Sequence, residues 1–176
     1  MGTVAVDPVI VYTMNWSGEY GVPCVPPATG AVLRLLATAT RATAVVEVGT
    51  GLGVSGLWLL AGLAPGAVLT TIDIDMDLQD MARQAYTTAG HERGRYRLLT
   101  GRADVLLSRL TDARYDLMFI DIDEDPDSLA AAAGRVLRPG GLLVVHRPST
   151  DDRARLAASA WHLAWLGPDL LGATLS

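Results

Sequence analysis

The sequence predicts an α/β fold with a mostly parallel sheet and helices on both faces. Short, nearly continuous apolar runs alternate along the chain with segments whose apolar residues recur at helical spacing. This alternation is typical of βαβ units, whose right-handed crossovers place helices on both faces of a parallel sheet. Near the end of the chain, residues 161–166 and 170–175 are separated only by Gly167, Pro168 and Asp169. We therefore expect these two segments to form a closing antiparallel hairpin.

The predicted strands are apolar runs bounded by turn residues. The run at 141–145, for example, directly follows Pro139 and Gly140. Short runs of this kind indicate strands that are buried on both faces of a parallel sheet. In chain order, strands are predicted at residues 44–48, 68–74, 95–99, 117–122, 141–145, 161–166 and 170–175.

The predicted helices show a longer period. Val32, Leu36 and Ala39 would share one face of the first helix. Asp77 is suited to cap a later helix, and Gly90 to end it. In chain order, helices are predicted at residues 28–39, 54–63, 78–89, 104–110, 127–137 and 151–160.

Composition excludes several classes of function. All 14 basic residues are arginine, which excludes a lysine base, a Schiff base and a P-loop lysine. The net charge of -5 without a basic stripe argues against nucleic-acid binding. The uncharged stretch 48–72 is broken by glycines and by Pro65, which argues against a membrane span. With one cysteine, Cys24, and no signal-peptide pattern at the N-terminus, we expect a cytoplasmic protein.

Polar residues and glycines follow each of the five strands predicted to be parallel. In α/β sheets, ligands bind at this carboxyl edge, near the point where the strand order reverses. The residues are Glu47 with the turn 49–56, Asp73 with Asp75, residues 101–104, Asp121 with Asp123, and His146 with Arg147. We expect them to surround one ligand site.

The glycine-rich turn after the first strand allows three interpretations. Gly51, Gly53 and Gly56 match the dinucleotide fingerprint of nicotinamide-dependent oxidoreductases, with an acidic residue about twenty positions later. A tight strand-to-helix turn without a ligand is the second interpretation. In the third, Glu47 at the strand end and glycines at alternate positions from Gly49 resemble the first motif of class I S-adenosylmethionine-dependent methyltransferases.

Four motifs in order make the third interpretation specific. They are Glu-Val-Gly-Thr-Gly-Leu-Gly-Val-Ser, Leu-Thr-Thr-Ile-Asp, Tyr-Asp-Leu-Met-Phe-Ile-Asp and Leu-Arg-Pro-Gly-Gly-Leu-Leu-Val-Val. Together they resemble the catechol/caffeoyl-CoA type of small O-methyltransferase, from about Pro23 to the end of the chain. The resemblance implies a seven-stranded, Rossmann-like methyltransferase domain at residues 23–176. It also implies the cofactor S-adenosylmethionine, the product S-adenosylhomocysteine and a small-molecule acceptor.

The resemblance assigns cofactor contacts residue by residue. Val25 would line the cofactor from above, Asp73 would accept hydrogen bonds from the ribose hydroxyls and Ile74 would pack on the adenine. Asp121 would lie beneath the sulfonium, at the border with the acceptor pocket. The other implied cofactor residues are Glu47, Gly49, Thr50, Gly51, Ser55, Gly101, Ala103 and Asp104. Two alternatives stay open, namely Ile74 as a core residue and Asp104 as a helix N-cap.

The chain departs from the family at the divalent-metal site. In the family, this site is formed by an Asp after the fourth strand and an Asp-Asn pair after the fifth. Asp121 matches the first ligand, but His146 and Arg147 take the other two positions, as in a small actinobacterial branch, and Glu124 replaces the lysine base. Arginine carries only donors, so we expect no metal ligation here and no need for Mg²⁺. His146 is the candidate general base, oriented by Asp121 or Asp123, with Arg147 stabilising the oxyanion. The alternative is that His146 only caps a strand end.

The N-terminal segment and the acidic run bear on the acceptor. Residues 1–22 show no regular period and are predicted to be irregular, a candidate lid whose aromatic residues would roof the acceptor site. Asp123 and Glu124 would face a cationic acceptor or bind a metal in an altered geometry, unless they simply lie in a solvated loop.

The family is commonly dimeric, so we expect a homodimer. Trp161 and Trp165 would lie either at its interface or in the core of the hairpin. O-methylation of a small molecule is the main functional expectation. A small-molecule N-methyltransferase of the same fold and a catalytically silent cofactor-binding protein are the alternatives.

Overall fold

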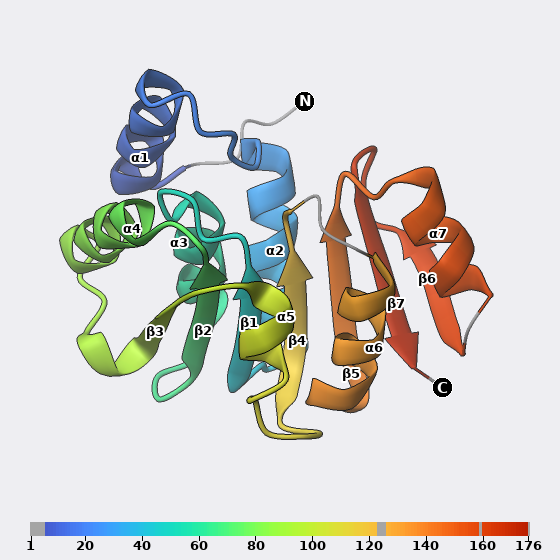
Figure 1. The fold of residues 1–176 in the computed structure, drawn as a ribbon. Coiled ribbons are helices and arrows are strands. Elements are labelled where there is room, and N and C mark those ends of the chain that lie inside the picture. The colour runs from blue at the N-terminus through green and yellow to red at the C-terminus, as the bar shows by residue number, and fades with distance from the viewer. Residues whose placement is uncertain (1–5, 123–125, 159, 176) are drawn as a thin grey trace.

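The computed structural model describes residues 6–122, 126–158 and 160–175. A seven-stranded sheet crosses it in the order β3-β2-β1-β4-β5-β7-β6 (Figure 1). The strands are β1 Ala44–Val48, β2 Val68–Asp73, β3 Tyr96–Thr100, β4 Tyr115–Ile120, β5 Leu137–His146, β6 Trp161–Trp165 and β7 Leu170–Leu175. The helices are α1 Pro8–Glu19, α2 Pro27–Ala39, α3 Val54–Gly62, α4 Met76–Thr88, the 3-10 helix η1 Arg93–Arg95, α5 Ala103–Leu107, α6 Pro126–Val136 and α7 Thr150–Ala157.

The strand pairing confirms the predicted mostly parallel sheet and its closing hairpin. Strands β1 to β5 pair in parallel, whereas β7 runs antiparallel to both of its neighbours, β5 and β6. The chain builds the sheet outward from β1 through β2 to β3 and then returns to place β4 on the other side of β1. The strand order therefore reverses between β1 and β4, and a ligand is expected at their carboxyl ends.

Side chains of the central strands alternate between two cores, one on each face of the sheet. Val45 and Phe119 pack with α2, α3 and α4 on one face of the sheet. Val46 and Met118 pack with α5, α6 and α7 on the other face. These four side chains are fully buried, which explains why the strands have continuous apolar sequences.

The prediction that residues 1–22 are irregular is wrong, because they contain helix α1. The carboxylate of Asp7 caps this helix by accepting a hydrogen bond from the amide of Val9 at 2.8 Å. Thr13 and Ser17 lie on the buried face of α1. These polar residues at core positions concealed the helical period.

Helix α1 packs against α3 and α4 (Figure 1). Its side chains Tyr12 and Trp16 border Gln84 and Thr88 of α4. The aromatic residues expected to form a lid are therefore beside α4, on the opposite face of the sheet from α6 and α7.

Smaller differences concern helix caps and the hairpin. Asp75, and not Asp77, caps α4, since its Oδ1 accepts hydrogen bonds from the amides of Asp77 and Leu78 at 2.9 and 3.1 Å. Trp161 packs in the core, whereas Trp165 is 53% exposed on the edge strand β6. Across the described ranges, no helix combines the length and apolarity needed to cross a bilayer.

Candidate active site

The glycine-rich turn between β1 and α3 uses three left-handed backbone positions, with φ values of +98° at Gly49, +49° at Gly51 and +91° at Gly53. A Cβ atom at Gly49 would lie 2.6 Å from the carbonyl oxygen of Asp121, so β1 and the end of β4 approach too closely for a side chain. At Gly51, the nearest atom to such a Cβ is Cγ1 of Val22 at 3.6 Å. Of these two glycines, Gly51 is thus the one that leaves room for a ligand.

Two adjoining cavities lie at the carboxyl ends of β1, β2 and β4. The first, which we call the glycine-loop cavity, measures about 200 Å³ and is lined by Val22, Pro23, Cys24, Gly49, Thr50, Gly51, Leu52, Val54, Ser55, Asp73, Leu78, Asp121, Ile122 and Arg147. The second, the Ile74 cavity, also measures about 200 Å³ and is lined by Val48, Gly49, Ile72, Asp73, Ile74, Gly101, Ala103 and Ile122. They share Gly49, Asp73 and Ile122, so one elongated ligand can occupy both.

Asp73 lies between the two cavities. One carboxylate oxygen accepts a hydrogen bond from the amide of Gly51 at 2.9 Å, and the other accepts from the amide of Asp75 at 3.0 Å. Each oxygen keeps a lone pair for a further donor, which suits a pair of ribose hydroxyls. Ile74 is 69% exposed at the rim, an unusual position for isoleucine that fits a flat apolar base stacked on it. The acceptor Asp73 and the apolar side chain of Ile74 together fit the ribose and adenine of S-adenosylmethionine.

The structure brings together most of the predicted cofactor residues. Gly49, Thr50, Gly51, Ser55, Asp73 and Asp121 line the first cavity, and Ile74, Gly101 and Ala103 line the second. Val25 is instead buried in the core, with an exposed fraction of 1%, and its neighbours Val22, Pro23 and Cys24 face the cavity.

Asp104 lies outside both cavities. It pairs with Arg102 at 2.9 Å within the first turn of α5, so it is neither a lining residue nor the N-cap, which is Arg102.

Glu47 lies fully buried beneath the glycine-rich turn and lines neither cavity. Burial raises its pKa to about 7, although the hydroxyls of Ser55 and Thr71 partly stabilise the carboxylate. The Thr71 hydroxyl donates to Oε2 at 2.6 Å and contacts the Thr50 hydroxyl at 2.7 Å. Glu47 therefore supports the turn from below through these threonines.

A cluster of charged side chains lies where the glycine-loop cavity meets the end of β5. Nδ1 of His146 is 2.7 Å from Oδ1 of Asp121, and Nε2 is 3.1 Å from Oδ2 of Asp169 in the β6–β7 turn. Nη2 of Arg147 donates to the same Asp121 oxygen at 3.2 Å. The Thr29 hydroxyl donates to the other oxygen of Asp169 at 3.2 Å, which connects the cluster to α2. Sequence reasoning missed Asp169 because it counted only as a turn residue.

The contacts of His146 bear on its predicted role as a general base, which stays a prediction. An ionised carboxylate only accepts hydrogen bonds, so the imidazole donates to both Asp121 and Asp169 when both of its nitrogens are protonated. Burial of the ring opposes this charge, but the hydrogen bonds and charges of Asp121 and Asp169 prevail and raise the pKa of His146 above its ordinary 6.5. An imidazolium has no lone pair to accept a proton. In this protonated form, His146 can hold Asp121 in position but cannot act as a base.

The residues at the family's metal positions do not fit a divalent cation. Both nitrogens of His146 are engaged by carboxylates, and Arg147 offers only donors. Within the described ranges, no group of three or more His, Cys, Asp or Glu residues could hold a metal. Asp123 and Glu124, which were considered as contacts for a cationic acceptor or a metal, lie outside the described residues.

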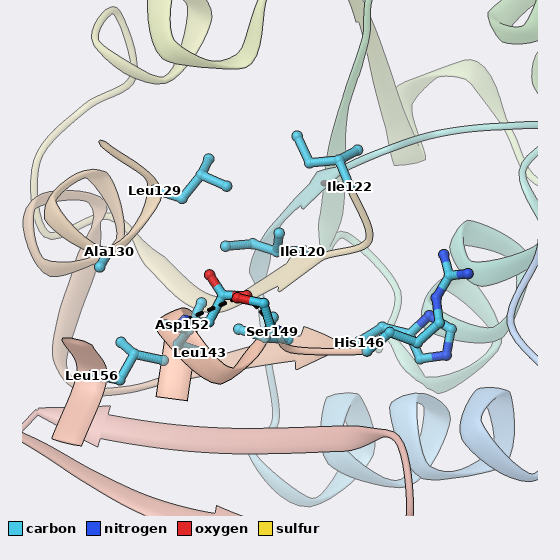
Figure 2. Close-up of a pocket in the computed structure, with 11 residues that line it drawn as sticks. Ile120, Ile122, Leu129, Ala130, Leu143, His146, Ser149, Asp152 and Leu156 are labelled. Carbon is cyan, nitrogen blue, oxygen red and sulfur yellow. Dashed lines mark hydrogen bonds between the residues drawn. The ribbon is translucent and has the colours of Figure 1, made fainter. Parts of the chain in front are cut away.

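A third cavity, the α6–α7 cavity, opens beside this cluster and measures about 240 Å³ (Figure 2). Figure 2 shows Leu129 and Ala130 of α6 on one side and His146 on the other. Its lining residues are Ile120, Ile122, Leu129, Ala130, Leu143, Val145, His146, Arg147, Ser149, Asp152 and Leu156. Ile122 and Arg147 also line the glycine-loop cavity, so the two cavities meet there.

Known proteins are similar to this chain in sequence and in fold. The sequence profile of a family described as a methyltransferase domain matches residues 46–147. A protein of Mycobacterium sp. (strain KMS), whose name places it among the O-methyltransferases, is 47% identical over 153 residues, 86% of this chain and 70% of that protein.

Two crystal structures illustrate the similarity of fold. A Corynebacterium glutamicum protein superposes with a TM-score of 0.89 at 27% identity, covering 99% of this chain and 92% of that one. The O-methyltransferase TomG of Streptomyces achromogenes, crystallised in complex with SAM, superposes with a TM-score of 0.87 at 24% identity, covering 98% and 92%.

This chain belongs to the methyltransferase family whose profile it matches. The match confirms the class predicted from the four motifs, an S-adenosylmethionine-dependent methyltransferase of the O-methyltransferase family with a Rossmann-like fold.

Proposed function

We propose that this methyltransferase transfers the methyl group of S-adenosylmethionine to an oxygen of a small molecule without a divalent metal. The observation that carries the proposal is the pairing of Asp121 with two cations, His146 and Arg147, at the border between the cofactor cavities and the α6–α7 cavity. These cations occupy the positions of two metal ligands in the family. The guanidinium of Arg147, and the imidazole of His146 when it is protonated, would supply positive charge at the positions of these ligands.

The cofactor residues that we propose follow from the two cavities. Asp73 would bind the ribose hydroxyls and Ile74 the adenine, while the backbone around Gly51 would approach the methionine part. The bound cofactor supplies an electrophilic methyl group on a sulfonium. The carboxylate of Asp121 lines the glycine-loop cavity, where its negative charge would favour a cationic ligand.

His146 and Arg147 fix the carboxylate of Asp121 in place. The side chain of His146 is 3% exposed, and its ring joins β5 to the β6–β7 turn through Asp169. Two donors on one carboxylate oxygen restrict its rotation and hold its charge at the border of the cavities. We propose that this fixed arrangement orients the two reactants, since methyl transfer depends on close, in-line placement.

The setting of the reaction is also a proposal. We place it in the cytoplasm because its single cysteine suits a reducing compartment. We place it in small-molecule biosynthesis by analogy with TomG, which is involved in tomaymycin synthesis. We propose a homodimer because Trp165 is exposed on the edge strand β6, which carries unpaired backbone groups. Size-exclusion chromatography with light scattering tests this, and a monomer at micromolar concentration would contradict it.

Turnover after chelation tests the proposed reaction. The purified chain, treated with EDTA, is incubated with methyl-labelled S-adenosylmethionine and panels of phenols, carboxylic acids and amines. We expect labelled oxygen products and no increase when Mg²⁺ is added back. Activity that requires Mg²⁺ contradicts metal independence, and transfer only to amines contradicts oxygen as the acceptor.

A further inference from the structure

We propose that a second ligand site, for the phosphate group of a small molecule, lies at the amino ends of the parallel strands. The site is a cavity of about 240 Å³ that is bordered by two arginines, and we call it the arginine cavity. Its lining residues are Thr43, Ala44, Gly66, Val68, Thr70, Arg97, Thr111, Arg114 and Tyr115. This lining shares no residue with the cofactor cavities or the α6–α7 cavity, so the site is separate from the methyl transfer.

The arginine cavity lies where the helices leave the sheet partly uncovered. Ala44, Val68 and Tyr115 are the first residues of β1, β2 and β4, so the cavity is at the lower end of the sheet in Figure 1. Thr70 pairs in register with Val46 of β1 and therefore points to the face that carries α5, α6 and α7. Helix α5 is only five residues long, and its residues do not line the cavity.

The guanidinium groups of Arg97 and Arg114 supply positive charge that no acid of the described chain neutralises. Within the described ranges, neither side chain makes a hydrogen bond or an ion pair. The two acids that flank Arg114 in the sequence, Asp112 and Asp116, are each paired with another arginine and do not line the cavity. The cavity therefore carries a local excess of positive charge in a protein whose net charge is -5, which favours an anionic ligand.

Two hydroxyl groups at the arginine cavity also lack a partner. Thr70 is 3% exposed and Tyr115 is 7% exposed. In the described part of the chain, neither hydroxyl makes a hydrogen bond, and neither is among the polar atoms sealed from solvent. Both hydroxyls are therefore open to the cavity and can donate to a ligand. A nearly buried hydroxyl without a partner costs free energy, which a bound acceptor would recover.

The placement of these donors fits a phosphate better than a carboxylate. Thr70 lies on β2, Arg97 on β3 and Tyr115 on β4, and Arg114 directly precedes β4, so the donors surround the cavity from different strands. A carboxylate offers two oxygens in one plane, whereas a phosphate ester offers three terminal oxygens that share its charge. The volume of about 240 Å³ is below the roughly 300–1,000 Å³ of pockets for drug-sized ligands. A small phosphate monoester is therefore the ligand that fits.

Calorimetric titration tests the class of ligand. Inorganic phosphate, glycerol 3-phosphate and acetate are each titrated into the purified chain at constant ionic strength. We expect saturable binding of both phosphates, with acetate at least about tenfold weaker. Absence of saturable binding by glycerol 3-phosphate overturns the proposal, whether or not inorganic phosphate binds. Acetate that binds as tightly as the phosphates overturns the assignment to phosphate.

Three charge variants test the location of the site. Arg97→Gln and Arg114→Gln should each weaken the binding of glycerol 3-phosphate at least about tenfold, because each removes a charged donor. The affinity for S-adenosylhomocysteine should stay unchanged in both variants. Arg34→Gln is the control, since it removes the same charge from an exposed position on α2, and it should bind like the wild type. An equal loss in all three variants would reveal general attraction by the surface and refute the site.

Two neighbouring threonines on β2 separate a role in binding from a role in folding. Thr70→Val should weaken the binding of glycerol 3-phosphate at least about threefold, yet its midpoint of urea unfolding without ligand should equal or exceed that of the wild type, because the lost hydroxyl has no partner in the described chain. Thr71→Val should lower the midpoint, since the Thr71 hydroxyl donates to Glu47 at 2.6 Å. Wild-type ligand affinity in Thr70→Val, or a midpoint lowered as much as in Thr71→Val, would contradict the proposal.

Discussion

Replacement of Asp169 by Asn tests whether His146 is held as a cation between two carboxylates. The change keeps the shape of the side chain and the backbone bond from the amide of Arg147 to the Asp169 carbonyl at 2.7 Å. It removes one of the two negative charges that face the buried imidazole. A hydrogen bond to a charged group contributes about 1.5–3 kcal/mol, against about 0.5–1.5 kcal/mol for a neutral pair. Because Asp169 is 30% exposed, we expect a loss near the lower difference, about 1 kcal/mol.

The pH dependence of this loss has a defined sign. The folded protein raises the pKa of His146 above 6.5, so its stabilising effect is complete below about pH 6.5 and disappears as the pH rises through the folded pKa. Asp169→Asn lowers that folded pKa. The destabilisation by Asp169→Asn should therefore be largest on the acid side of this window and shrink as the pH rises through it.

Urea unfolding over a series of pH values measures the effect. Thr29→Val is the control, because it removes the other hydrogen bond to Asp169 at 3.2 Å and leaves the imidazole contact in place. We expect the control to cost a similar free energy at every pH. A penalty for Asp169→Asn that does not change with pH, or that matches Thr29→Val throughout, would refute the account of His146 as a cation.

Two further predictions concern the glycine-rich turn and the acid below it. Gly49→Ala should cost about 3 kcal/mol or more, because its φ is +98° and its Cβ would lie 2.6 Å from the Asp121 carbonyl. Gly51→Ala, whose Cβ would make only an ordinary van der Waals contact with Val22 at 3.6 Å, should cost about 1–2 kcal/mol. Equal losses in thermal unfolding would contradict this difference. Burial raises the pKa of Glu47 to about 7, so the folded state binds more protons than the unfolded chain between about pH 4.5 and 7. The free energy of unfolding should therefore fall as the pH rises across this range. Glu47→Gln should remove that decline in urea titrations, and an unchanged decline would show that another group causes it.

Much of the fold could be predicted from the sequence because the central strands are buried on both faces. The strand at residues 44–48 agrees with β1 at both ends, since no polar residue except Glu47 interrupts its apolar run. Helix α1 was missed because Thr13 and Ser17 occupy its buried face. The cap of α4 was predicted too late in the chain, at Asp77, because Asp75 has the same side chain and only the backbone decides which one precedes the first turn.

The cofactor cavities were easier to predict than the transfer site. Gly51 and Asp73 lie in local motifs whose spacing fixes their place at the strand ends. The role of His146 depends on Asp169, which is 23 residues away and reaches it through the antiparallel pairing of β5 and β7. A sequence pattern carries no signal for such a contact. The assignment of His146 as a base stays a prediction, and its contact with Asp169 is one that only the fold reveals.

Calorimetric titration with S-adenosylhomocysteine tests the central claim most directly. The account predicts binding that is unaffected by EDTA or Mg²⁺, no binding of NAD⁺, and at least about a tenfold loss of affinity in Asp73→Ala, which removes a charged acceptor between the two cofactor cavities. The exposed Asp80→Ala on α4 is the matched control and should bind like the wild type. Absence of S-adenosylhomocysteine binding, or equal affinity in Asp73→Ala and the wild type, would contradict the account.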